Sequence, residues 1–253
     1  MEILFYPEKL EPNNKKSRIS RIISEVKDIK VHNDPNKYHD LHIFWSFTRH
    51  SIKPDKITLG YPNIINRGCW DISKIKVNNI FNDISIDPTE YIGECVEKYD
   101  RQGMHNFHKI VNCPTLKKPD YIYQKYIKTI ENGLYVRYRV SYAGEITYIR
   151  KIYQKHPFET NVIKDELVPI RNIFSEEQEI DFNNKCKIFG FDLGDVDVLI
   201  DNGNPVVIDI NNVVGPASVL PNKDNYNKID KAIVKYLYKM ANIPFKEIDF
   251  YLK

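Results

Sequence analysis

The sequence predicts a mixed α/β protein (α+β or α/β), in which a small β-α-β unit precedes a larger unit built on an antiparallel sheet. Strand-like and helix-like segments alternate in the first third, which is typical of a β-α-β unit. Between residues 93 and 155, five strand-like segments follow one another with short polar turns, which favours antiparallel pairing. At "DPTEY" the sequence changes from alternating strand-like and helix-like segments to consecutive strand-like segments. We therefore place the domain boundary near residue 88, between domains 1–88 and 89–253.

The first unit is expected to contain two strands and two helices. "EILFYP" predicts the first strand, and "LHIFWSF" (41–47) predicts a second, buried one. A helix over 17–28 is predicted between them, because apolar residues recur there at helical spacing. These residues are Ile19, Ile22, Ile23 and Val26. A short helix is predicted in "WDISKIKVNNIF", after Asp71 as a suitable N-cap.

The second unit is predicted to begin with the run of strands. Its segments are "GECVEKYD" (93–100), "FHKIV" (107–111), "YIYQKYI" (121–127), "GLYVRYRVSY" (133–142) and "EITYIRKIYQK" (145–155). A loop over 156–174 follows. Ser175 and Gln178 then form a predicted capping box, and Gly190 suits the end of that helix. Its apolar stripe is Phe182, Cys186 and Phe189. The final helix is predicted from Ile229, Ala232, Ile233, Tyr236, Leu237 and Met240.

Composition argues against several functional classes. The net charge of +3 is too small to indicate nucleic-acid binding. No apolar run approaches the roughly 18 residues of a membrane helix, and the start of the chain lacks the features of a signal peptide. The four cysteines have no paired spacing, so neither a zinc knuckle nor a disulfide framework is indicated. We therefore expect a cytoplasmic protein with reduced thiols and with neither nucleic-acid nor membrane partners.

The stretch "DVDVLIDNGNPVVIDINN" (195–212) carries acids inside a strand-like, aliphatic pattern. Two antiparallel strands are predicted around "DNGNP". A two-residue turn at Asn202-Gly203 would pair residue 197 with 208 and scatter the acids over both faces. A three- or five-residue turn would pair 197 with 209 and 195 with 211, which collects the polar side chains on one face. Burial of the aliphatic face favours the second register.

That register predicts Asp197, Asp209 and Asn211 as neighbours on one face of the hairpin. Directly opposite residues have Cβ atoms about 4.5–5.5 Å apart, and like charges at that distance are costly unless they are neutralised. A hard divalent cation such as Mg²⁺ would neutralise them and would bridge to nucleotide phosphates. The alternative is a solvated hairpin face with ordinary surface acids.

On these residues the sequence resembles the ATP-grasp superfamily, whose metal-binding hairpin has an Asp on one strand and an acid-x-Asn triplet on the next. Here "VDVL" supplies Asp197 and "DIN" supplies Asp209 and Asn211, with Asp where the family usually has Glu. The resemblance covers roughly residues 89–216. The stretches "INRGCWDISK", "CVEKYD" and "FGFDLGDVDVL" also resemble a group of bacterial ATP-grasp proteins.

The resemblance implies ATP and Mg²⁺ as cofactors, with Mn²⁺ as an alternative cation. It makes Lys98 the lysine that contacts the ATP phosphates, and it places the adenine hinge along 124–127, with Glu131 at the ribose. Those hinge residues are Gln124, Lys125, Tyr126 and Ile127. The flexible phosphate loop would be "RQGMHNFHKIV", which has one glycine where the family has several.

The arginines of the paired strands are expected to line the site as catalytic groups. Arg137 and Arg139 point the same way by alternation, and Arg150 lies on the next strand. A guanidinium binds phosphate or carboxylate through two parallel hydrogen bonds.

The activity implied by the resemblance is a Mg-ATP-dependent ligase that activates a carboxylate as an acyl phosphate, which an amine or a similar nucleophile then attacks. A phosphotransferase acting on a hydroxyl of a small molecule or sugar stays open, because the hairpin is also similar to that of ATP-grasp inositol phosphate kinases. So does a nucleotide-binding module without catalysis. The partners implied are ATP and an unidentified small-molecule, peptide or glycan acceptor, and a homodimer is compatible with the family.

Overall fold

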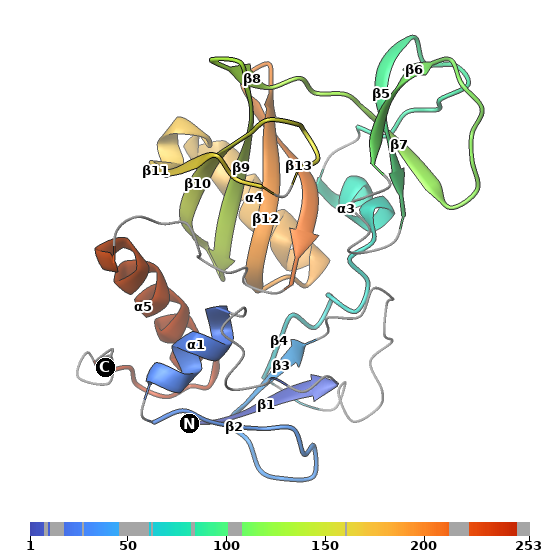
Figure 1. The fold of residues 1–253 in the computed structure, drawn as a ribbon. Coiled ribbons are helices and arrows are strands. Elements are labelled where there is room, and N and C mark those ends of the chain that lie inside the picture. Colours follow the sequence, from blue (N-terminus) through green and yellow to red (C-terminus); the bar gives the residue numbers. More distant parts are fainter. Residues whose placement is uncertain are drawn as a thin grey trace.

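The computed structural model describes residues 1–7, 10, 18–26, 28–45, 61, 63–81, 84–100, 108–159, 161–212 and 223–246 (Figure 1). These residues form three sheets, one parallel and two antiparallel, with helices packed on them. The mixed α/β class predicted from the sequence is confirmed. No helix in these ranges is long and apolar enough to cross a membrane.

The first unit is a parallel sheet of four strands in the order β2-β1-β3-β4. Its strands are β1 (Glu2–Pro7), β2 (Lys30–His32), β3 (Leu41–Trp45) and β4 (Ile64–Ile65). Helix α1 (Arg18–Glu25) connects β1 to β2, as a β-α-β unit requires. The short strands β2 and β4 were not predicted, because two or three residues are too few to show a period.

The C-terminal helix α5 (Lys223–Met240) packs against this first sheet. Its buried Ile233 and Leu237 share one apolar core with Ile3, Phe5 and Ile22. Figure 1 shows α5 lying beside α1 on the same side of the sheet. The chain therefore returns to its first unit at the end. The division into 1–88 and 89–253 stays a prediction.

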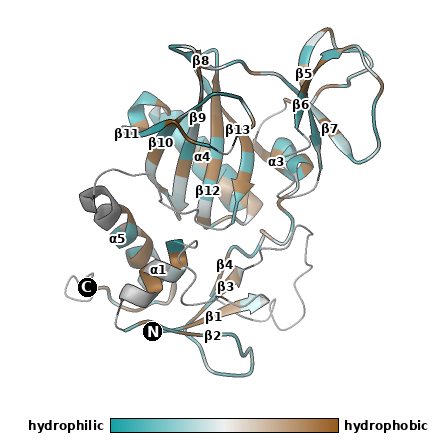
Figure 2. Ribbon diagram, in the orientation of Figure 1, coloured by the Kyte–Doolittle hydropathy of each residue, from teal (hydrophilic) through white to brown (hydrophobic). Residues whose placement is uncertain are grey.

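The central sheet is antiparallel, with the order β11-β10-β9-β12-β13 and with β8 paired to β9. Its strands are β8 (Ile130–Glu131), β9 (Leu134–Ala143), β10 (Ile146–Gln154), β11 (Lys164–Val168), β12 (Leu193–Asp201) and β13 (Asn204–Asn211). Hydrophobic and hydrophilic residues alternate along these strands (Figure 2). One face is buried against α4 (Glu176–Phe189), and the other face carries the polar side chains.

Helix α4 follows the prediction closely. Ser175 and Gln178 form a reciprocal capping box, and Gly190 ends the helix in a left-handed conformation (φ 74°). The predicted stripe of Phe182, Cys186 and Phe189 is buried. This stripe supports the apolar face of the central sheet, so it holds the opposite, polar face in place.

Two local predictions need correction. Helix α3 (Lys74–Phe81) is capped by Ser73, whose Oγ accepts a hydrogen bond from the Lys76 N–H at 3.3 Å, whereas Asp71 accepts from the Ser73 N–H in the preceding turn. The segment 156–174 is not a plain loop, because it contains β11 and a short 3₁₀ helix over Ile170–Asn172. Strand β11 is stabilised by pairing with β10, a tertiary contact without a local sequence signal.

A third, smaller sheet has the order β6-β5-β7, with β5 (Gly93–Tyr99), β6 (Lys109–Cys113) and β7 (Tyr121–Lys125). Its register brings the buried thiols of Cys95 and Cys113 within 2.7 Å of each other, a pairing that the cysteine spacing did not indicate. The segments predicted at 93–100, 107–111 and 121–127 all contribute to this sheet. It lies beside β13 and α3 in Figure 1.

Candidate functional site

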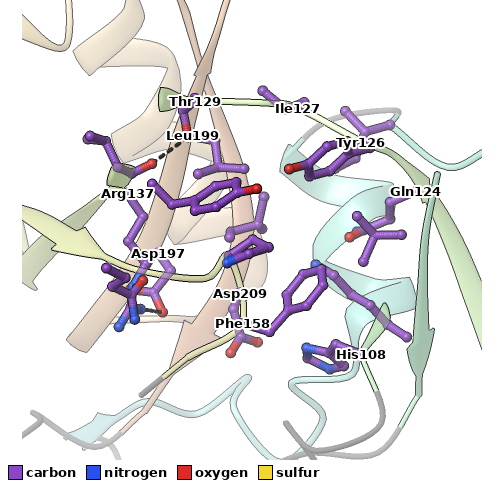
Figure 3. Close-up of a pocket in the computed structure, with 18 of the residues that line it drawn as sticks. His108, Gln124, Tyr126, Ile127, Thr129, Arg137, Phe158, Asp197, Leu199 and Asp209 are labelled. Atoms are coloured by element: carbon purple, nitrogen blue, oxygen red, sulfur yellow. Dashed lines mark hydrogen bonds and ion pairs between the residues drawn. The ribbon is translucent and has the colours of Figure 1, made fainter. Parts of the chain in front are cut away.

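A cavity of about 260 Å³ lies between the polar face of the central sheet and the three-stranded sheet. Its walls come from β5 and β7 on one side and from β9, β12 and β13 on the other. Figure 3 shows Gln124 and Tyr126 facing Arg137, Asp197 and Leu199 across this space.

The hairpin has the register that burial favoured, in which Asp197 pairs with Asp209 and Asp195 pairs with Asn211. The turn, however, is the two-residue Asn202-Gly203 turn, with φ values of 51° and 81°. The two-residue turn and the pairing of Asp197 with Asp209 are compatible because the register shifts by one residue after Asp197. This shift leaves Ile208 as an extra residue on β13. The expectation that a longer turn is needed was therefore wrong.

The bulge at Ile208 also changes which side chains reach the cavity. Successive residues of a regular strand point to opposite faces. Ile208 and Asp209 are consecutive, and yet both line the cavity. A bulge re-aims a side chain in this way. One strand thus supplies an apolar group and an acid to the same site.

The register places polar residues in rows across four strands of the central sheet. One row pairs Arg150, Arg139, Asp197 and Asp209, and the adjacent row pairs Tyr148, Ser141, Asp195 and Asn211. Asp197, Asp209 and Asn211 all line the cavity, so they are on the same face. Asp195 lies deeper, where the Ser141 hydroxyl donates to its Oδ1 at 2.5 Å.

Asp197 is held between two arginines. Arg137 Nη1 donates to its Oδ2 at 2.7 Å, and Arg139 donates to Oδ1 from Nε at 2.8 Å and to Oδ2 from Nη2 at 3.0 Å. Burial alone would raise the pKa of Asp197, but the two guanidiniums outweigh it and hold the pKa well below its usual value. The carboxylate is therefore ionised at any physiological pH.

Asp209 and Asn211 differ from Asp197 in their partners. Within the described ranges, no side chain donates a hydrogen bond to the Asp209 carboxylate or to the Asn211 amide oxygen. Both residues are only partly buried and line the cavity. Their oxygens are therefore available to a ligand.

Lys98 faces this hairpin from β5. Its side chain is buried and lines the cavity, and no ion pair holds its ammonium group among the described residues. Burial lowers the pKa of Lys98 to about 8, with Lys74 adding to this effect and with Asp209 and Asp197 opposing it. A buried cation without a counter-ion indicates a site for an anion.

The cavity has two chemically different ends. Five cations and three carboxylates are among the described residues that line it, which gives a local charge of +2. The charged residues are Lys74, Lys98, Lys125, Arg137, Arg139, Glu159, Asp197 and Asp209. At the other end Ile84, Ile127, Leu199 and Ile208 pack together in one apolar cluster, and Val96 adds a further apolar group to the lining. An apolar slot next to a cationic pocket suits a planar base joined to an anionic group.

The predicted hinge residues Gln124, Lys125, Tyr126 and Ile127 all line the cavity. Gln124 is buried, and its Nε2 donates to Asn78 Oδ1 at 2.6 Å. The backbone N–H groups of Lys125 and Tyr126 donate to the carbonyls of Ile84 and Glu94. The N–H of Ile127 has no partner within the described part of the chain and is available to a ligand.

Two of the predicted site residues lie outside the cavity lining. Arg150 is buried beside it and donates from Nη1 to Asp165 Oδ2 at 3.2 Å. Glu131 is exposed on β8 and forms an ion pair with Lys151. Residues 101–107 of the predicted phosphate loop lie outside the described residues. The roles given to Arg150, Glu131 and this loop stay predictions.

The structure adds lining residues that the sequence did not single out. Phe158, from the connection between β10 and β11, meets the His108 ring edge to face at 5.8 Å (Figure 3). Lys74 reaches the cavity from the first turn of α3 and is buried. Its only sequence signal is its place in "INRGCWDISK", and Phe158 has none.

No protein-family model matches the chain, and no curated protein matches its sequence. Solved structures do match. A D-alanine–D-alanine ligase from Bacillus anthracis, solved with ATP, is 17% identical over 96% of this chain and 99% of the ligase, with a TM-score of 0.58. The ATP-grasp ligase PsnB, in complex with the precursor peptide PsnA2 and AMPPNP, is 11% identical over 93% and 97%, with a TM-score of 0.55. The macrocyclase MdnC from Microcystis aeruginosa, bound to precursor peptide MdnA, is 13% identical over 94% and 100%, with a TM-score of 0.52.

Proposed function

Because the chain has the ATP-grasp fold, we propose that it is an ATP-dependent ligase that binds Mg-ATP in this cavity. It would activate a carboxylate as an acyl phosphate, which an amine or similar nucleophile then attacks. The observation that carries the proposal is the convergence of Asp197, Asp209 and Asn211 on one cavity wall, with Lys98 facing them. That the neighbours PsnB and MdnC were solved with precursor peptides supports a peptide as acceptor.

The donor set fits a hard divalent cation. Asp209 and Asn211 offer oxygens that are not engaged by other described side chains, and oxygen is the ligand that Mg²⁺ prefers. Asp197 already accepts hydrogen bonds on both oxygens, which leaves it room for one further contact. When bound, the cation would neutralise charge on the β- and γ-phosphates. Asp209 and Asn211 would hold it most directly.

The cationic residues would act on the phosphates themselves. Lys98 would lie against the phosphate oxygens and offset their charge in a site with little water. Arg137 and Arg139 are fixed in direction by Asp197, so they need no reorganisation when charge develops on the transferred phosphoryl group. Transfer of this kind depends on positioning and charge neutralisation, and it needs no side-chain nucleophile.

The apolar end would hold the adenine. Ile84, Val96 and Leu199 offer flat, aliphatic walls, and the N–H of Ile127 offers one hydrogen bond at the edge of the base. Gln124 would add a side-chain amide to that edge, held in place by Asn78.

Calorimetric titration with ADP in the presence of Mg²⁺, and then with excess chelator, tests this proposal. We expect binding that Mg²⁺ strengthens by about 10-fold or more. Equal affinity with and without the metal would contradict the metal site, and no binding in either case would contradict the proposal as a whole. Once an acceptor is found, an amide product distinguishes a ligase from a kinase, which would give a phosphoester.

The lowered pKa of Lys98 leads us to expect a specific pH dependence of nucleotide binding. Its pKa of about 8 in the free protein must rise when phosphate binds, so the affinity falls as pH rises above 8. Between pH 7 and 9.5 we expect the Kd for Mg-ADP to increase by about 30-fold, since the protonated fraction of the free protein falls in that proportion. In Lys98→Arg the guanidinium stays charged, so that variant should show a flat profile. The same pH profile in both proteins would refute the role of Lys98.

A further inference from the structure

Asn66 immediately follows β4, at the end of the first sheet, and its side chain contacts the backbone at the base of the acidic hairpin. The residue is fully buried, and its backbone has a left-handed conformation with φ 61°. Asn tolerates this conformation better than most residues do. It belongs to the stretch "INRGCWDISK". Of that stretch, Lys74 alone lines the proposed nucleotide site among the described residues.

The Asn66 amide satisfies four backbone groups of the hairpin base. Its Oδ1 accepts from the N–H groups of Asp192 and Leu193, each at 2.9 Å. Its Nδ2 donates to the carbonyl of Leu193 at 2.7 Å and to that of Asn212 at 3.4 Å. The Asn66 backbone N–H donates to the Asp192 carboxylate at 2.8 Å.

These contacts are placed where the hairpin enters and leaves the sheet. Leu193 begins β12, two residues before Asp195, and Asn212 directly follows Asn211 at the end of β13. Backbone groups at such ends have no ladder partner, and when buried they must find one elsewhere. An amide that both donates and accepts can therefore join the two strands at their open end.

The surrounding backbone packs too closely to allow much adjustment. A Cβ atom on Gly68 would come within 1.9 Å of the Phe189 carbonyl oxygen, and one on Gly194 would come within 2.1 Å of the Asn211 carbonyl oxygen. The Gly68 N–H also donates to the Gly190 carbonyl at 3.0 Å. The stretch that begins at Asn66 is therefore packed on the end of α4, directly before the hairpin, and the two strands of the hairpin are in close contact at Gly194 and Asn211.

We propose that Asn66 is a positioning residue for the metal site, which sets the place of Asn211, and through it of Asp209, relative to Asp197. This rests on the proposed function, because the residues it positions are the proposed metal ligands. It also gives the first unit a part in catalysis, since a residue at the end of its sheet holds the metal-binding hairpin. Groups that orient metal ligands without touching the metal typically change metal affinity by about 10–100-fold when they are replaced.

The test compares Asn66→Gly with the wild-type chain and with Phe182→Leu. Gly keeps the positive φ and removes all four side-chain hydrogen bonds. Phe182 lies in the core behind the sheet, against Phe81 and Phe174, and its replacement lowers stability without touching the hairpin base. Free Mn²⁺ is measured by electron paramagnetic resonance at saturating ADP, metal-free ADP affinity is measured by calorimetry, and the melting temperature is recorded for each variant.

We expect Asn66→Gly to weaken Mn²⁺ binding by about 10-fold or more, while metal-free ADP binding stays within about twofold of wild type. Phe182→Leu should lower the melting temperature and leave Mn²⁺ affinity unchanged. If Asn66→Gly does not fold, Asn66→Asp keeps the two accepted hydrogen bonds and loses the two donated ones, and the same loss of Mn²⁺ affinity is expected. An Asn66→Gly or Asn66→Asp variant that melts early but binds Mn²⁺ as the wild type does would overturn the proposal. A wild-type chain that binds no Mn²⁺ with ADP would overturn the metal site itself.

Discussion

Asp209→Asn is expected to abolish most of the affinity that Mg²⁺ adds to nucleotide binding, a loss in metal affinity at least as large as the roughly 10–100-fold that follows replacement of a group that only orients a metal ligand. The substitution keeps the shape of the side chain and removes the charge that holds the cation. Because the Asp209 carboxylate has no partner among the described side chains, the free energy of unfolding without metal should change by no more than about 0.5 kcal/mol. Calorimetric titration of ADP with and without Mg²⁺, together with urea unfolding, measures both quantities.

Asp181→Asn is the matched control for this experiment. Asp181 lies on the surface of α4, paired with Lys185, and α4 packs on the apolar face of the sheet, opposite the polar face. The control should leave both metal affinity and stability near the wild-type values, since exposed ion pairs contribute about 0–1 kcal/mol. Wild-type metal affinity in Asp209→Asn would remove Asp209 from the metal site.

Asp197→Asn is expected to have a different signature, in which the fold itself is weakened. The Asp197 side chain is 8% exposed, and those of Arg137 and Arg139 are 17% and 21% exposed. Removing the carboxylate leaves two largely buried guanidiniums without a counter-ion, which typically costs about 3–5 kcal/mol. Urea unfolding of the metal-free protein measures this loss.

The pH dependence of this effect follows from the sign of the pKa shift. The folded-state pKa of Asp197 lies below its ordinary value, so the stabilisation is fully present above about pH 5 and is lost only as pH falls toward the folded-state pKa. The difference in unfolding free energy between wild type and Asp197→Asn should therefore be constant from pH 5 to 8 and shrink below pH 4.

Asp201→Asn provides the comparison within the same hairpin. Asp201 pairs with Lys125 at 2.7 Å, but these side chains are 27% and 43% exposed. Solvent screens this pair, so its loss should cost less than about 1 kcal/mol. Equal destabilisation by Asp197→Asn and Asp201→Asn would contradict the view that burial of the arginines makes Asp197 essential to the fold.

Much of the site could be predicted from the sequence because strands alternate. Asp197, Arg137 and Arg139 sit on polar positions of otherwise apolar strands, and burial of the aliphatic face determines which way they point. The helices α4 and α5 were equally readable, since their apolar stripes, and the caps of α4, are local features. Alternation also places Arg150 beside Arg139 in the sheet. Its side chain, however, pairs with Asp165 of β11, and the local sequence pattern did not predict that strand.

The chain's own pattern determined the composition of its strands, the acids and arginines that share a face, and the helices that bury their stripes, because each depends on residues close in sequence. Only the folded structure decided the bulge at Ile208, which reconciles a two-residue turn with the register of the acids. It also decided that Lys98 faces Asp209 and that Asn66 reaches the base of the hairpin. Such contacts join segments far apart in the chain, and their geometry is determined by how the sheets pack against one another.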